Sequence, residues 1–177
     1  MSNMNIPAAM LILAMLMAGA SCPVHAVTPV EFKGNLVLPL CTINNNNPVT
    51  VSFDDVDIQA MPVSGSPYNQ QDFPVNMFCP YTLGTPMLTV TSASVYNAPG
   101  GIINTSKSSE GLVVFLRQKG GGLVLPLGTA TDVTSSITGA GTDLTLTLNA
   151  ALGQMNGMDK LTPGPFTATA NLQVQYQ

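Results

Sequence analysis

The sequence predicts an all-β domain, an immunoglobulin-like β-sandwich, and three observations support this fold class. Several short segments alternate apolar and polar residues, which is the pattern of strands with one buried face. Gly, Pro and Asn, which favour turns, separate these segments along the chain. The length of 177 residues allows one domain with a hydrophobic core, and no low-complexity linker divides it.

The first segment predicts export. Residues 6–20 are apolar, and small and polar residues follow them. This run is too short for a comfortable membrane span but suits the core of a signal peptide. The triplet Val24–Ala26 fits a small-x-small cleavage site, so we expect residues 1–26 to be removed. A lipoprotein signal with Cys22 as the lipidated residue is disfavoured, because Gly19 stands where Leu is normally required.

The rest of the chain offers little to catalysis. The only His is His25, in the removed segment, which excludes Ser-His-Asp, Cys-His and His-metal sites. Cys41 and Cys79 remain as an even pair in an exported protein, which predicts one disulfide. Charged residues make up 8% with a net charge of -4, so a nucleic-acid partner is not expected. We predict no catalytic residue, no metal site and no cofactor.

A strand-like arm opens the mature chain. Residues 27–38 read VTPVEFKGNLVL and alternate from the predicted new N-terminus, until Pro39 interrupts them before Cys41. We therefore divide the chain into a signal peptide (1–26), an N-terminal arm (27–38) and one domain (39–177). One face of the arm carries Val30, Phe32, Gly34, Leu36 and Leu38.

The same patterns place strands along the domain. An alternating or continuous apolar run, bounded by turn residues, marks each of them. The last run reaches Gln177 with no turn after it. We expect strands within residues 49–53, 75–79, 87–96, 111–118, 142–152 and 166–177.

The last strand indicates an incomplete sandwich. Its apolar face has no following strand in the sequence to cover it, so we interpret the domain as lacking its final strand. Such a strand exposes backbone groups and apolar side chains beside an open groove, which another molecule must cover. The alternative is that this strand is central, with its neighbours already in place. The apolar face comprises Phe166, Ala168, Ala170, Leu172, Val174 and Tyr176.

The arm is the natural candidate for the missing strand. Folding back onto its own domain is awkward, because only Pro39 and one further residue link it to Cys41. Donation to a neighbouring copy, head to tail, is the alternative. Such a contact does not close on itself and therefore builds a fibre.

Five stretches carry a resemblance to a known family. They read VEFKGNLVLPLCTI, VDIQAM, FPVNMFCPYTLGT, NTSKSSEGLVVFL and GPFTATANLQVQYQ, in that order. The chain resembles the subunits of chaperone–usher pili, most closely the tip-fibrillum type of P pili. Gly164 and the penultimate aromatic Tyr176 match the family's C-terminal signature, and Gly34 matches the small residue kept in its arms. The departures are a signal peptide without basic residues near its start and Phe78 before Cys79.

The resemblance implies a mechanism. A periplasmic chaperone would insert one of its own strands into the groove and would bind the carboxylate of Gln177. At the outer-membrane usher, the arm of the incoming subunit would replace that strand, and the fimbrium would reach the cell surface. Val30, Phe32, Leu36 and Leu38 would enter the preceding subunit, with Gly34 where the groove is shallow. The acceptor edge would comprise Gly164, Phe166, Ala168, Ala170, Leu172, Val174, Tyr176 and Gln177.

Two other functions stay open on the sequence. Within the same class of pilus, the runner-up is a major rod or adaptor subunit. A self-complete secreted β-sandwich that binds a ligand through its loops is the alternative from a different class.

Overall fold

The computed structural model describes residues 28–62 and 64–177, so the predicted signal peptide lies outside the described residues. Contacts divide the chain at Asn35 and Leu36 into two units. In the first unit, residues 28–35 form no strand, and Val30 and Phe32 are 70% and 91% exposed. The strand expected over residues 27–38 is thus absent from the described part, because a β-strand needs a ladder partner.

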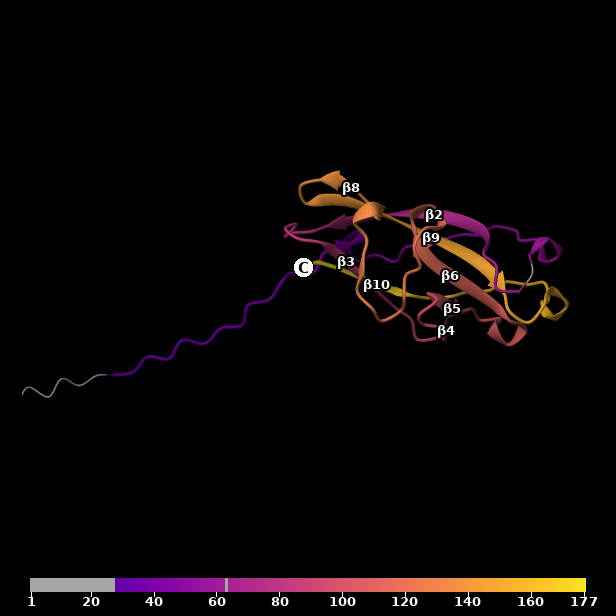
Figure 1. The fold of residues 1–177 in the computed structure, drawn as a ribbon, viewed down its shortest axis with the longest axis horizontal. Helices are drawn as coiled ribbons and strands as arrows, with labels where there is room; N and C mark the ends of the chain where they lie inside the picture. The colour runs from indigo at the N-terminus through magenta and orange to yellow at the C-terminus, as the bar shows by residue number, and fades with distance from the viewer. Residues whose placement is uncertain (1–27, 63) are drawn as a thin grey trace, which may run out of the picture. The chain divides into compact units, whose positions relative to one another are not determined.

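Residues 36–177 fold into two antiparallel sheets (Figure 1). The larger sheet has the order β1-β2-β9-β6-β5-β4, with β8 also pairing with β9, and the smaller has the order β10-β3-β7. The all-β sandwich predicted from the sequence is confirmed. The strands are β1 (Thr42–Ile43), β2 (Tyr68–Phe78), β3 (Pro86–Thr91), β4 (Val95–Asn97), β5 (Ile102–Asn104), β6 (Leu112–Gln118), β7 (Thr131–Asp132), β8 (Ile137–Ala140), β9 (Asp143–Gln154) and β10 (Asn171–Tyr176).

Short 3-10 turns connect the strands. No helix in residues 28–62 and 64–177 is long and apolar enough to cross a membrane. The turns are η1 (Asn44–Asn46), η2 (Ile58–Ala60), η3 (Ser108–Glu110), η4 (Lys119–Gly121), η5 (Thr134–Ser136) and η6 (Met158–Lys160).

The core lies between the sheets and is built by alternation. Leu144, Leu146 and Leu148 of β9 point into it, and Thr145 and Thr147 between them are half-buried. The continuous apolar run of β6 is buried on both faces. Val113 and Phe115 on its outward face form a small second cluster with Ile102 of β5 and Ala151 of β9.

A disulfide joins Cys41 to Cys79, as predicted. It ties the residue before β1 to the residue after β2, and both sulfur-bearing residues are buried. Thr42 pairs with Phe78 directly beside it. The disulfide therefore fixes the start of the domain at one end of β2.

Four predicted strands differ from the structure, and one of them, expected at residues 75–79, is the longer β2, which begins at Tyr68. The run 87–96 splits at residues 92–94, because β3 belongs to the smaller sheet and β4 to the larger. Residues 49–53 form no strand, and β10 begins at Asn171 instead of Phe166. Neither residues 49–53 nor residues 166–170 pair with another strand within the described part of the chain.

Candidate functional site

The outer edge of β10 carries backbone groups that point away from its sheet. Gln177 exchanges two backbone hydrogen bonds with Thr85, at 2.8 and 3.0 Å, so the odd-numbered residues of this strand face β3. The Val174 carbonyl points the other way and accepts a hydrogen bond from the Cys41 N–H at 2.9 Å. Because backbone direction alternates along an antiparallel strand, the groups of Leu172 also face this outer side.

The same alternation continues upstream of β10. Thr167 accepts a backbone hydrogen bond from the Ser106 N–H at 2.8 Å, and its own N–H donates to Ser106 Oγ at 3.1 Å. The Thr169 carbonyl accepts from Ser92 Oγ at 2.8 Å. Within the described residues, no hydrogen bond reaches the backbone of the even-numbered positions 166, 168 and 170. Residues 166–172 therefore present one unpaired backbone edge.

A groove of two adjoining cavities, each of about 1040 Å³, lies along this edge. The first cavity runs beside residues 166–173, and the second lies beside residues 161–166. Phe53 and Phe166 line both cavities. The groove thus lies beside residues 161–173, which include five of the eight residues predicted for the acceptor edge.

The first cavity opens onto the hydrophobic core. Its floor includes buried side chains from both sheets, among them Val90 of β3, Val114 and Leu116 of β6, and Leu148 of β9. An apolar side chain that entered this cavity would therefore contact the core directly. This is the property expected of a sandwich that another chain must complete.

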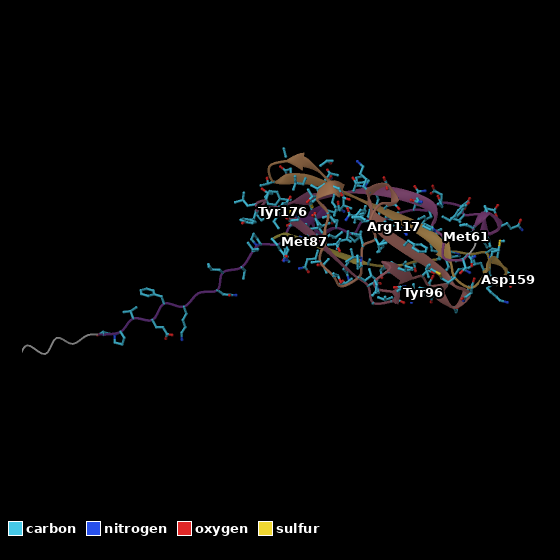
Figure 2. All side chains as sticks on the ribbon, in the orientation of Figure 1. Met61, Met87, Tyr96, Arg117, Asp159 and Tyr176 are labelled. Carbon is cyan, nitrogen blue, oxygen red and sulfur yellow. A yellow bond between two sulfur atoms is a disulfide. The ribbon has the colours of Figure 1, made fainter. Side chains whose placement is uncertain are left out.

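The eight predicted acceptor residues lie in three kinds of environment, which are the core, the surface and the lining of the groove. Val174 and Tyr176 are buried in the core, at 0% and 7% exposure, and Tyr176 lies at the end of β10 (Figure 2). Burial raises the pKa of the Tyr176 phenol. Gln177 is exposed. The groove is lined by the remaining five, which are Gly164, Phe166, Ala168, Ala170 and Leu172.

The opposite wall of the groove, residues 48–56, also lacks a ladder. No backbone–backbone hydrogen bond of these residues is found within the described part of the chain. The Phe53 carbonyl accepts a hydrogen bond from Asn69 Nδ2 at 3.0 Å. Asn69 has a φ of 48°, at the bulge that interrupts the pairing of β2 with β9. A side chain therefore tethers this wall.

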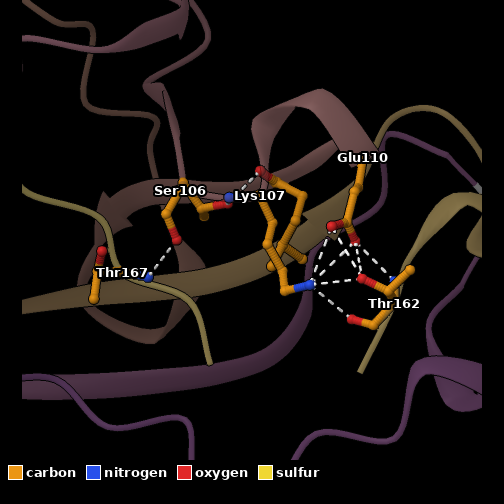
Figure 3. Close-up of polar contacts among 7 residues, drawn as sticks. Ser106, Lys107, Glu110, Thr162 and Thr167 are labelled. Carbon is orange, nitrogen blue, oxygen red and sulfur yellow. Dashed lines mark hydrogen bonds and ion pairs between the residues drawn. The ribbon is translucent and has the colours of Figure 1, made fainter. Parts of the chain in front are cut away.

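A polar clamp fixes the far end of the groove (Figure 3). Lys107 Nζ lies 3.1 Å from Glu110 Oε1 and donates hydrogen bonds to the Thr162 carbonyl and hydroxyl at 2.9 and 2.8 Å. The Thr162 N–H donates to Glu110 Oε2 at 2.7 Å. This backbone hydrogen bond, together with Lys107, lowers the pKa of Glu110. The i,i+3 spacing of Lys107 and Glu110 is a local signal for their ion pair, whereas their contacts with Thr162 have no such signal in the sequence.

Gly164 connects the clamp to the groove edge. Its φ of 136° is a conformation that residues with a Cβ rarely adopt, so this position favours Gly. The turn it makes carries the chain from Thr162 to Phe166. The backbone conformation at position 164 thus explains why glycine is favoured there.

Residues 30–177 of the chain match the family described as Fimbrial protein. The chain belongs to this fimbrial family. Fimbrial protein PrsE of Escherichia coli is 38% identical over 157 residues, which cover 86% of this chain and 87% of PrsE. Fimbrial adapter PapF of the same organism is 25% identical over 162 residues, covering 88% of this chain and 92% of PapF.

Solved pilus subunits share the fold of this fimbrial protein. The P pilus adaptor subunit PapF has a TM-score of 0.53 at 23% identity, covering 81% of this chain and 100% of that chain. The P pilus rod subunit PapA has a TM-score of 0.54 at 22% identity, covering 84% and 100%. The chain is thus a subunit of a chaperone–usher pilus, exported and assembled at the cell surface, and not an enzyme.

The predicted donor residues Leu36 and Leu38 lie at the surface of the second unit. Leu40 pairs antiparallel with Gln175, so the residues before Leu40 run past the end of β10. Leu36 and Leu38 are 101% and 47% exposed, and neither lines either of the two cavities of the groove. A Cβ atom added at Gly34 would have no atom within 4 Å, apart from those of its two chain neighbours. The predicted donor face is therefore free at these positions.

Proposed function

We propose that this chain is a tip-fibrillum subunit of the PapE type that polymerises by donor-strand exchange. The observation that carries the exchange mechanism is the unpaired backbone edge of residues 166–172 beside a groove that reaches the core. The tip position rests on the sequence resemblance. A rod or adaptor role is the second candidate, because PapA and PapF share the fold.

An extended strand fits this site. Residues 166–172 span about 20 Å at the rise of a β-strand, and the arm face from Val30 to Leu38 is about 27 Å long. Both walls offer unpaired backbone groups, so a strand between them gains hydrogen bonds on two sides. The alternate side chains of the arm then point into the groove. Gly34, among larger neighbours, suits a point where the backbone must come close.

Burial of the arm supplies the free energy of association. Burying a large apolar side chain contributes about 1.5–3 kcal/mol, and Val30, Phe32 and Leu36 are mostly exposed in the free chain. Leu38 is 47% exposed and gains about half as much. The four together contribute roughly 5–10 kcal/mol before the cost of ordering the arm. Subunits joined in this way should separate slowly.

The unpaired edge and the apolar lining of the groove indicate which partners the subunit needs. A free edge beside exposed apolar surface is prone to aggregation, so the subunit needs a periplasmic chaperone that occupies the groove before assembly. Gln177 is exposed and therefore accessible to polar or basic residues of that chaperone. An outer-membrane usher then brings the arm of a neighbouring subunit to replace the chaperone strand.

Deletion of residues 27–38 tests this function. We expect the shortened chain to co-purify with the chaperone, because its groove is intact, and to form no fibre. The matched control replaces Glu31 and Lys33, which form an exposed ion pair in the arm, with Gln; it should polymerise normally. Fibres of normal length from the deletion would show that the arm is not the donor. Exchange of the arm peptide against a panel of chaperone–subunit complexes then distinguishes the tip, adaptor and rod roles.

A further inference from the structure

We propose that Phe53 and Phe166 form an aromatic clasp that closes the empty groove and controls how fast a donor strand enters it. This inference rests on the proposed function. The two ring centroids are 6.2 Å apart, with the planes tilted by 36°. One ring belongs to each wall of the groove, and both rings line both cavities. The ring contact therefore lies where the two cavities adjoin.

A donor strand has to pass the clasp. Phe166 is the first residue of the unpaired edge, and Leu172 is the last before the Cys41 hydrogen bond closes it. A strand that pairs along the whole edge reaches Phe166 and the second cavity beyond it. The two rings contact one another across this path in the empty groove. They must separate before a continuous strand can occupy both cavities.

Phe53 is the half of the clasp that is free to move. The only backbone tie of Phe53 among the described residues is the 3.0 Å hydrogen bond from Asn69 Nδ2 to its carbonyl. Gln71 Nε2 in turn donates to Asn69 Oδ1 at 2.9 Å and orients that amide. Asn69 is therefore a positioning residue for the clasp. Moving Phe53 breaks one side-chain hydrogen bond and no ladder.

Phe166 is held more firmly. The next residue, Thr167, makes two hydrogen bonds to Ser106, and the clamp holds Thr162 four residues upstream. Opening of the clasp thus moves Phe53 and its wall away from the fixed edge. This motion exposes the unpaired backbone N–H and C=O groups of both walls. A donor strand can then form hydrogen bonds with them.

The structure leads to a specific expectation for the rate of entry. An aromatic pair contributes about 0.5–1.5 kcal/mol beyond its buried area, so its loss should speed strand entry about 2- to 10-fold. Loss of the Asn69 tether should act in the same direction. If the rings instead served only as contacts for the bound donor, their truncation would speed donor dissociation and leave entry unchanged.

The experiment measures entry of a fluorescent peptide of residues 27–38 into the full mature chain co-purified with its chaperone. Association and dissociation rates are recorded for wild type, Phe53→Leu and Asn69→Ala. Tyr96→Leu is the control, because Tyr96 is 52% exposed on β4 (Figure 2) and does not line the groove. We expect faster entry for the first two variants and an unchanged rate for the control.

The outcomes separate the clasp from the proposed function. Unchanged or slower entry in both Phe53→Leu and Asn69→Ala would overturn the clasp while leaving donor-strand exchange in place. Failure of the wild-type complex to take up the peptide would overturn donor-strand exchange itself, and the clasp with it. If Phe53→Leu does not fold, the decision rests on Asn69→Ala, which changes no residue that lines a cavity.

Discussion

Leu36 and Val37 are adjacent in the arm, and the structure makes them a matched pair for testing the donor register. Both are exposed in the free chain, at 101% and 74%. A donor strand presents alternate residues to the groove, so only one of them can be buried. The sequence pattern assigns Leu36 to the groove face and Val37 to the opposite face.

The expected magnitude follows from these exposures. Leu36 is fully exposed before insertion, so Leu36→Ala should remove about 2–3 kcal/mol of burial in the groove. Because 1.4 kcal/mol corresponds to a factor of ten, the arm should dissociate roughly 30- to 150-fold faster. Val37→Ala removes a side chain that stays at the surface and should change this rate less than about twofold.

Competition between labelled and unlabelled peptides of residues 27–38, on the chaperone-free subunit–peptide complex, measures both dissociation rates. A large effect of Val37→Ala with little effect of Leu36→Ala would refute the register, because a shift of one residue exchanges the two faces of a strand. Equal small effects would refute burial of the arm altogether.

Three other perturbations test separate parts of the site. Gly34→Arg should block exchange, since a long charged side chain cannot enter a shallow apolar groove; stopped-flow uptake of the variant peptide measures this. Removal of Tyr176 and Gln177 should abolish co-purification with the chaperone, because it deletes a buried aromatic ring and the terminal carboxylate. Glu110→Gln should lower the thermal unfolding midpoint at pH 7. The Glu110 pKa is lowered in the folded state, so its contribution is full above its usual pKa of 4.5 and disappears as the pH falls through the lowered value. The midpoints of the variant and wild type should therefore converge in acid.

Much of the fold was predictable because its strands alternate against a single core. Residues 142–152 place their Leu side chains on one face, and β9 buries those side chains. The continuous run at residues 111–118 indicates burial on both faces, which β6 shows. The Cys41–Cys79 disulfide followed from an even count of Cys in an exported chain.

The walls of the groove were not predictable in the same way. Residues 49–53 have the composition of a strand, but strand formation depends on a partner, and the described chain supplies none there. Phe166 fails to start β10 for the same reason. The clamp of Lys107, Glu110 and Thr162 joins residues more than fifty positions apart, and no local pattern encodes such a contact.

Under the proposed donor-strand exchange, the register of Leu40 with Gln175 favours an open chain of subunits over an arm that closes on its own domain. The arm leaves the domain where β10 ends, whereas the free edge extends from Leu172 back to Phe166. To enter its own groove, the arm would have to reverse direction just before Leu40, where the Leu40–Gln175 pairing and the hydrogen bond from the Cys41 N–H to the Val174 carbonyl hold the chain extended beside the end of β10. If copies line up with the same orientation, as the proposed exchange requires, the arm would enter the next groove at its Phe166 end and run antiparallel to β10. Each contact then leaves one arm and one groove unused, so addition continues at a free end and produces a fibre with a fixed polarity.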